Sequence, residues 1–240
     1  MAAIASEVKV PLPDGKTLDA SLALPDTTGT HPGVVVLHEA FGLNDDIRRI
    51  CRRLASEGYV ALAPDLYSHG NRGLCLTRVM VDSWTSAGRQ TLDDIEAARA
   101  ALAERPEVDL ERIAVLGFCQ GGGFALAFAV QGSVRAAGVN YGAVPKDRDK
   151  LVGICPVVAS YGGRDRIMGS HGERLERYLT DLGVPHDVKT YPGVGHSFLS
   201  QHENWITRLP NPMATGYSEP EAEDAWTRIL AFFAEHLKAP

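Results

Sequence analysis

The sequence RIAVLGFCQGGGFALAFAV, residues 112–130, decides how this chain folds. Its first part, residues 113–116, is a short apolar run rich in β-branched side chains, which is typical of a buried parallel strand. Its last part, residues 124–130, is apolar on every face and predicts a buried helix. A sharp turn from strand to helix must therefore lie between them.

That turn has a cysteine at its centre. Gly117-Phe118-Cys119-Gln120-Gly121 has the spacing of the G-x-S-x-G nucleophile elbow, with cysteine in the serine position. The glycines on both sides allow the chain to pass through a crowded, strained turn. A thiol at the N-terminus of the following helix is favoured as a thiolate by the helix dipole. The alternative is that Cys119 is only a small buried side chain in a glycine-rich crossover, so the motif needs partners elsewhere in the chain.

Composition limits the class of protein. A chain of 240 residues with 45% hydrophobic and 22% charged residues is typical of one globular α/β domain, which we expect over residues 1–240. A net charge of −6 and the lack of basic runs argue against a nucleic-acid partner. No stretch has the length of a membrane span, and the N-terminus does not resemble a secretory signal. The four scattered cysteines form no zinc or redox motif, so we expect a reduced cytoplasmic protein without a metal or cofactor.

Alternation of apolar and polar residues predicts an N-terminal antiparallel hairpin over residues 7–10 and 17–24, with Asp14-Gly15 in its turn. Shorter and more uniformly apolar runs predict buried strands of a mostly parallel sheet. They cover residues 33–38, 59–63, 136–141, 156–161 and 186–191.

Helical periodicity separates these strands. Asn44 is a plausible N-cap for a helix over residues 45–56, which has two carboxylates in its first turn. Further helices are predicted at 91–104, 173–182 and 219–237. Alternating strands and helices indicate an α/β fold with a mostly parallel central sheet and helices on both faces.

Residues 64–90 form a long polar connection without a clear period. Connections of this length inside a compact domain usually carry function or cover a site. We therefore expect a cap segment over the pocket, with a short helix at 79–84.

Three chemically distinct residues follow predicted strands. Cys119, Asp165 and His196 occur in the chain order nucleophile, acid, histidine of the α/β-hydrolase triad. Alone, Asp165 could be a turn residue and His196 a solvated loop residue. Together they supply a nucleophile, a base for its proton and an acid that fixes the tautomer of the base. The oxyanion hole would be formed by the N–H groups of Gln120 and Ala40.

The chain resembles the dienelactone hydrolases, or carboxymethylenebutenolidases, which are cysteine members of the α/β-hydrolase superfamily. The resemblance extends from the N-terminal hairpin to the last helix. Its motifs are E-x-F-G at residues 39–42, G-F-C-Q-G-G at 117–122, G-R-D at 163–165 and G-H-S-F at 195–198. The resemblance implies the α/β-hydrolase fold and the hydrolysis of a small ester or lactone through a thiolate and an acyl-enzyme. It also implies that Glu39 holds the resting thiol and takes its proton when substrate binds. We expect the neighbouring His38 to belong to the core or to support the site indirectly.

The substrate side of the resemblance is weaker than the catalytic side. Family members bind a substrate carboxylate through arginines, one of which follows the G-H-S-F motif, whereas Leu199-Ser200-Gln201 stands there in this chain. Candidates for substrate contacts are the following residues: Arg72, Arg78, Arg89, Phe41, Tyr141 and Phe198. The expected partner is a small ester or lactone, bound by a monomer or a homodimer.

Two other classes of protein remain open at this stage. One is a flavodoxin-like cysteine enzyme of the glutamine amidotransferase-like superfamily, which also pairs a cysteine elbow with an early carboxylate. The Asp165 and His196 loops and the N-terminal hairpin favour the hydrolase instead. The other is a binding module that keeps the hydrolase fold without its activity. A requirement for His196 and turnover of a simple ester would separate the hydrolase from both.

Overall fold

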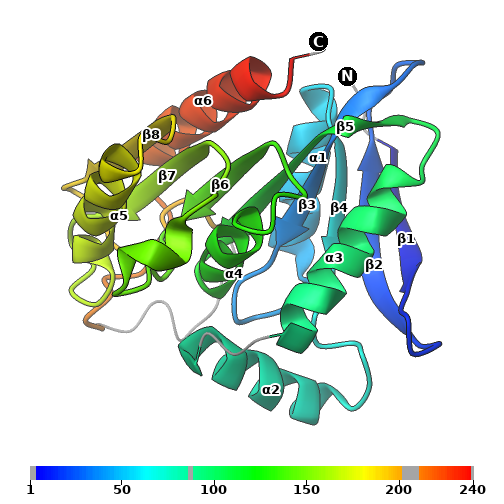
Figure 1. The fold of residues 1–240 in the computed structure, drawn as a ribbon, viewed down its shortest axis with the longest axis horizontal. Coiled ribbons are helices and arrows are strands. Elements are labelled where there is room, and N and C mark those ends of the chain that lie inside the picture. Colours follow the sequence, from blue (N-terminus) through cyan, green and yellow to red (C-terminus); the bar gives the residue numbers. More distant parts are fainter. Residues whose placement is uncertain (1–3, 86–88, 202–210, 239–240) are drawn as a thin grey trace. The chain divides into compact units, whose positions relative to one another are not determined.

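The computed structural model describes residues 4–85, 89–201 and 211–238 (Figure 1). The chain forms two compact units, one ending at Val115 and the other running from Leu116 to Lys238. Strand β5 (Val108–Phe118) passes from the first unit into the second, with its last residues leading into the cysteine turn. That residues 1–240 act as a single domain stays a prediction.

In the first unit, an antiparallel hairpin leads into parallel strands. Strands β1 (Ile4–Pro11) and β2 (Thr17–Leu24) pair in the predicted hairpin, with Val8 opposite Ala20. Strand β2 then pairs antiparallel with β4 (Val60–Pro64), which pairs parallel with β3 (His31–Leu37). The hydrogen-bonded order is β1-β2-β4-β3-β5.

Helix α1 (Asp45–Ser56) begins and ends where the sequence predicts. The side chain of Asn44 accepts a hydrogen bond from the Ile47 N–H at 3.0 Å, so it satisfies one of the free donors of the first turn. Helix α1 packs on β2 and β4, and helix α3 (Arg89–Ala103) packs on β3 and β4. Every residue of β4 is buried, as expected for a strand covered on both faces.

The predicted cap segment contains a longer helix than expected. Helix α2 covers Arg72–Thr85, whereas the sequence predicted only 79–84. Its start is fixed by Asn71, whose side-chain oxygen accepts from the N–H groups of Gly73 and Leu74 at 3.1 and 3.3 Å. The sequence analysis did not predict this cap, because glycines lie on both sides of Asn71, at positions 70 and 73. Residues 86–88 of the segment lie outside the described residues.

In the second unit, the strand order is β5-β6-β7-β8, and β6 (Ala136–Asn140), β7 (Val157–Gly162) and β8 (His186–Tyr191) are parallel. Among the described residues of this unit, the α-helices are α4 (Gln120–Ala129), α5 (Gly169–Asp181) and α6 (Glu219–His236). A short 3-10 helix, η1 (Arg148–Leu151), was not predicted.

Helices α5 and α6 cover opposite faces of β7. Ser160 accepts a hydrogen bond from Arg228 of α6 at 3.2 Å, whereas a Cβ on Gly172 of α5 would lie 3.0 Å from the ring of Tyr161. Since successive side chains of a strand point to opposite faces, both faces of β7 are buried against helices. This doubly covered parallel sheet confirms the predicted α/β class. In the described ranges, no helix has the length and apolar character that crossing a membrane requires.

Candidate active site

Cys119 lies on a strained turn between β5 and α4, as the motif predicts. Its backbone has φ 52° and ψ −116°, a conformation that non-glycine residues rarely adopt. The chain turns so tightly that a Cβ on Gly117 would lie 2.0 Å from the Gly121 carbonyl oxygen. The motif glycine at 117 is therefore a steric requirement of the turn. The N–H of Cys119 donates to the Asn140 carbonyl at 3.0 Å, and its side chain is partly exposed.

Asp165 lies in the turn that follows β7 and has three hydrogen-bond donors. Its Oδ1 accepts from the N–H groups of Ile167 and Met168 at 2.9 and 3.0 Å, and its Oδ2 accepts from His196 Nδ1 at 2.7 Å. Burial by itself raises the pKa of Asp165, but the His196 bond and the two backbone donors outweigh it, so the pKa lies below its ordinary value. Asp165 is thus held as a carboxylate.

His196 follows β8 and is buried beside Asp165. Two backbone bonds fix its position, because its N–H donates to the Met213 carbonyl at 2.8 Å and its carbonyl accepts from the Gly216 N–H at 3.2 Å. The turn that contains Asp165 and the loop that contains His196 are also joined directly, because the Arg164 N–H donates to the Val194 carbonyl at 2.8 Å. The support from residues 211–216 was not predicted, since a pattern of backbone bonds has no sequence signal.

The pair of Asp165 and His196 determines how the imidazole can react. A carboxylate only accepts hydrogen bonds, so the ring nitrogen that faces it, Nδ1, carries a proton. In the neutral ring the lone pair is then on Nε2, which is the nitrogen that can accept a proton. The three predicted triad residues all lie in the second unit, and the structure brings the acid and the histidine into contact.

The predicted residues at 39–42 lie in the first unit, directly after β3. Glu39 is buried, with 3% of its surface exposed, and its carbonyl accepts from the Gly42 N–H at 3.0 Å. The Tyr67 hydroxyl donates to the Ala40 carbonyl at 3.2 Å. Phe41 is 41% exposed. The loop is therefore held by its own backbone and by Tyr67, while Phe41 is left accessible.

His38 is a core residue, in line with the prediction. Its Nδ1 donates to the Glu39 carbonyl at 2.7 Å, and its Nε2 accepts from the Leu66 N–H at 3.1 Å. Burial lowers its pKa, because the charged ring would lose its hydration. Both nitrogens are used in joining two loops.

The candidate arginines have different surroundings. Arg72 is largely exposed, donates from Nη1 to Asp65 Oδ2 at 2.8 Å and lies 5.7 Å from the ring centroid of Tyr67. A Cβ on Gly42 would lie 2.9 Å from its Nη2, so the guanidinium borders the 39–42 loop. Arg78 instead pairs with the buried carboxylate of Asp94 at 2.9 Å. Arg89 belongs to the exposed start of α3.

Two predicted substrate contacts of the second unit are fully buried. The Tyr141 ring lies 4.8 Å from the His196 ring, and its hydroxyl is 2.8 Å from Ser200 Oγ. The Phe198 ring packs between Tyr141 and Tyr191, at 5.9 and 5.0 Å. Contact of either residue with substrate stays a prediction.

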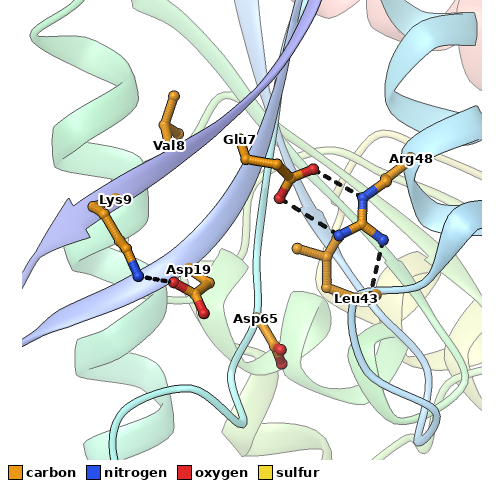
Figure 2. A pocket seen from close by; sticks show the side chains of 7 residues that line it. All are labelled: Glu7, Val8, Lys9, Asp19, Leu43, Arg48 and Asp65. Atoms are coloured by element: carbon orange, nitrogen blue, oxygen red, sulfur yellow. Dashed lines mark hydrogen bonds and ion pairs between the residues drawn. The ribbon is translucent and has the colours of Figure 1, made fainter.

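The first unit also has a surface cavity of about 450 Å³, shown in Figure 2. Its lining residues are Glu7, Val8, Lys9, Asp19, Leu43, Arg48 and Asp65. Its charged groups are all paired: Arg48 binds Glu7 at 2.9 Å and Lys9 binds Asp19 (Figure 2), while Asp65 binds Arg72 from outside the lining. A charged ligand would have to break one of these pairs. Nowhere in the described part of the chain do three His, Cys, Asp or Glu side chains gather as a metal site would need.

The fold and the strained cysteine turn define an α/β hydrolase. The sequence profile of the dienelactone hydrolase family matches residues 18–237, so the chain belongs to that family. Two bacterial relatives are named "Putative carboxymethylenebutenolidase": one from Yersinia pestis is 31% identical over 92% of this chain and 85% of its own, and one from Methylorubrum extorquens is 30% identical over 97% and 81%. The crystal structure of a "Putative Dienelactone Hydrolase" from Klebsiella pneumoniae superposes with a TM-score of 0.82 at 29% identity, covering 98% of this chain and all of that one.

Proposed function

We propose that this protein is a cysteine-dependent hydrolase of a small ester or lactone. The observation that carries the proposal is the buried Asp165–His196 pair, joined at 2.7 Å, in the same unit as a cysteine on a strained strand-to-helix turn. A buried acid with three donors and a ring of fixed tautomer is what a general base requires. Membership of the dienelactone hydrolase family supports the same reaction class.

The reaction would proceed in two steps. Glu39 takes the thiol proton of Cys119, the thiolate attacks the carbonyl carbon, and the C–O bond to the leaving alcohol breaks. The proton then passes from Glu39 to His196 and from His196 to that alcohol. A water molecule, deprotonated by His196, then attacks the thioester and releases the acid and the thiol. The N–H groups of Gln120 and Ala40 would stabilise the negative oxygen of each tetrahedral intermediate.

The role of Glu39 in the reaction is inferred from the family resemblance. In this proposal the carboxylate accepts the thiol proton when substrate binds, so that the reactive thiolate exists only in the complex. A thiol that stays protonated at rest is protected from oxidation, because the thiolate is the form that oxidants attack. Its burial directly after β3 suits a carboxylate with a defined partner better than a solvated one.

Arg72 is the stronger candidate for recognising an acidic substrate. It borders the 39–42 loop, is largely exposed and has one neighbouring carboxylate, Asp65. Arg78 is occupied by the buried Asp94. We therefore propose that a carboxylate of the substrate binds Arg72 while its apolar part lies against Phe41.

The experiment is a turnover screen of p-nitrophenyl esters and dienelactones with the wild type, C119A and C155A. The last variant is the matched control, since burial raises the pKa of the Cys155 thiol to about 12 and keeps it unreactive. We expect turnover by the wild type and C155A but not by C119A, with iodoacetamide labelling mapped to Cys119 by mass spectrometry. Equal turnover by C119A would contradict the proposal. If nothing is hydrolysed and Cys119 is not labelled, the fold serves as a binding module.

A further inference from the structure

We propose that Asn140 and Tyr141, the residues at the end of β6, are positioning residues, Asn140 for the cysteine turn and Tyr141 for the histidine ring. The inference deepens the proposed function and rests on it. In this proposal the end of one strand holds both the cysteine turn and the histidine ring in place. Neither residue would touch the reacting atoms in this proposal.

Asn140 binds the cysteine turn at two places. Its backbone carbonyl accepts from the Cys119 N–H at 3.0 Å, and its side-chain Nδ2 donates to the Gly117 carbonyl at 3.3 Å. The start of α4 lies against the same residue, because a Cβ on Gly122 would be 2.8 Å from the Asn140 carbonyl oxygen. A backbone held at φ 52° costs about 1–3 kcal/mol, so its surroundings must fix it. Asn140 supplies bonds on both sides of Phe118.

The chemistry of Asn140 is unusual for its position. The other residues of β6 read Ala-Ala-Gly-Val, and the whole strand is buried. Among the described residues, no protein group donates to the Asn140 Oδ1. A buried oxygen without a hydrogen-bond donor costs free energy. An apolar side chain would fill this place without that cost. The bond from Nδ2 to the turn is therefore the physical reason for an asparagine here.

Tyr141 binds the histidine side of the site. Its φ of 42° turns the chain at the end of the strand, and its N–H donates to the Ser160 carbonyl at 2.7 Å. This places its ring 4.8 Å from the His196 ring at an interplanar angle of 54°. Its hydroxyl bonds Ser200 Oγ at 2.8 Å, in the turn that follows the histidine. The ring is thus fixed at both ends and restricts the rotation of the imidazole.

The first test compares N140L, of similar size but without the donor, with V139A, a control in the same buried strand. We measure kcat and KM for p-nitrophenyl acetate, the rate of Cys119 alkylation by iodoacetamide, and the melting temperature. In N140L we expect kcat and the alkylation rate to fall about tenfold while KM stays within twofold. V139A should melt earlier but keep both rates. If N140L does not fold, N140S, whose hydroxyl is too short to reach Gly117, replaces it.

Wild-type rates in the Asn140 variant, or an equal loss of rate in V139A, would overturn the role of Asn140. Failure of the proposed hydrolase function would give a different result from failure of the role of Asn140. In that case the wild type hydrolyses no ester, while the alkylation rates of wild type and N140L still report whether Asn140 positions the thiol.

The second test is a double-mutant cycle of Y141F and S200A. Because the two hydroxyls share one hydrogen bond, each variant should lower kcat about threefold, and the double variant should lose no more than either alone. The alkylation rate of Cys119 with excess iodoacetamide provides the internal control, since the cysteine turn is not altered. Losses that multiply in the double variant, or unchanged kcat in both single variants, would overturn the role of Tyr141.

Discussion

Each unit of the molecule contains a buried histidine bound to a buried aspartate, and the two pairs differ in what surrounds them. In the second unit His196 Nδ1 lies 2.7 Å from Asp165, whose other oxygen accepts two backbone N–H groups. In the first unit His69 Nδ1 lies 3.0 Å from Asp94, whose other oxygen accepts from Arg78 at 2.9 Å. The distances alone do not separate a candidate catalytic pair from a structural one.

The second nitrogen of each ring separates them. His69 Nε2 lies 3.0 Å from Asp14 in the turn of the N-terminal hairpin, so both nitrogens of this ring face carboxylates. Both nitrogens of His69 are therefore taken up by contacts within the first unit, where Gln90 Nε2 also lies 3.4 Å from its Nε2. The His69 ring joins the hairpin turn to α3, and through Asp94 to Arg78 of α2. In the second unit, His196 Nδ1 faces Asp165, which is the arrangement a general base needs.

The largest difference should appear between D165N and D94N. We expect D165N to lower kcat about 10³- to 10⁴-fold, because an amide no longer fixes the reactive tautomer or stabilises the imidazolium. D94N should keep kcat within twofold once the fraction of folded enzyme is measured. The assay is steady-state hydrolysis of p-nitrophenyl acetate with titration of the reactive thiol. A hundredfold loss in folded D94N would contradict the division between the two pairs.

The next largest effect concerns stability. R78M removes the cation that binds the buried carboxylate of Asp94 and should lower the free energy of unfolding by about 2 kcal/mol. R72M removes a guanidinium that is 62% exposed from the buried Asp65. It should cost less than about 1 kcal/mol, because solvent already screens the arginine side of this pair. Urea unfolding followed by fluorescence measures both. Equal losses would mean that Arg78 is not part of the structural cluster.

The same two variants should reverse their order in substrate binding. If Arg72 binds a substrate carboxylate, R72M should raise KM about tenfold for an ester that carries a carboxylate and leave KM unchanged for p-nitrophenyl acetate. R78M should change neither. An equal rise of KM for both esters in R72M would indicate a general disturbance of the 39–42 loop rather than charge recognition.

The sequence predicted those parts of the fold that depend on local pattern. The Asn44 cap, the two hairpin strands and strand β8 follow from alternation and capping chemistry, which act within a few residues. The triad candidates could be found because each follows a strand, and the carboxyl ends of parallel strands gather at one edge of a sheet.

Features that depend on distant residues could not be predicted. Asp14, His69 and Asp94 are 55 and 25 residues apart along the chain, and no spacing rule connects them. For the same reason the sequence offered Arg78 as a substrate contact with no sign of its buried partner. The positive φ of Tyr141 has no signal in the residue type, because residues other than glycine rarely adopt it.

The smallest expected effect is the dependence of stability on pH, where the two aspartates act in opposite directions. Burial raises the pKa of both carboxyls. In Asp165 the hydrogen bonds from His196 and from the backbone N–H groups of Met168 and Ile167 lower the pKa by more than burial raises it. In Asp94 the effect of burial is larger than the opposite effects of His69 and Arg78. The pKa of Asp165 therefore lies below the ordinary 3.8 and that of Asp94 above it. Asp165 stabilises the fold above pH 3.8, and this contribution is lost as the pH falls through its folded pKa. Asp94 binds its proton more tightly in the folded state, so it adds stability as the pH falls from its folded pKa toward 3.8.

These opposite signs predict which part of the pH curve each variant changes. In urea unfolding measured in steps from about pH 6 to pH 2, D165N should flatten the loss of unfolding free energy below about pH 4. D94N should not change that part of the curve and should remove the gain in unfolding free energy that lies above about pH 4. The matched control is D109N, a partly exposed carboxylate whose pKa also lies below its ordinary value, through Arg112 and the Glu111 N–H. A D94N curve that changes only below pH 4 would mean that Asp94 is held as a carboxylate by His69 and Arg78, and that the two pairs have the same electrostatics after all.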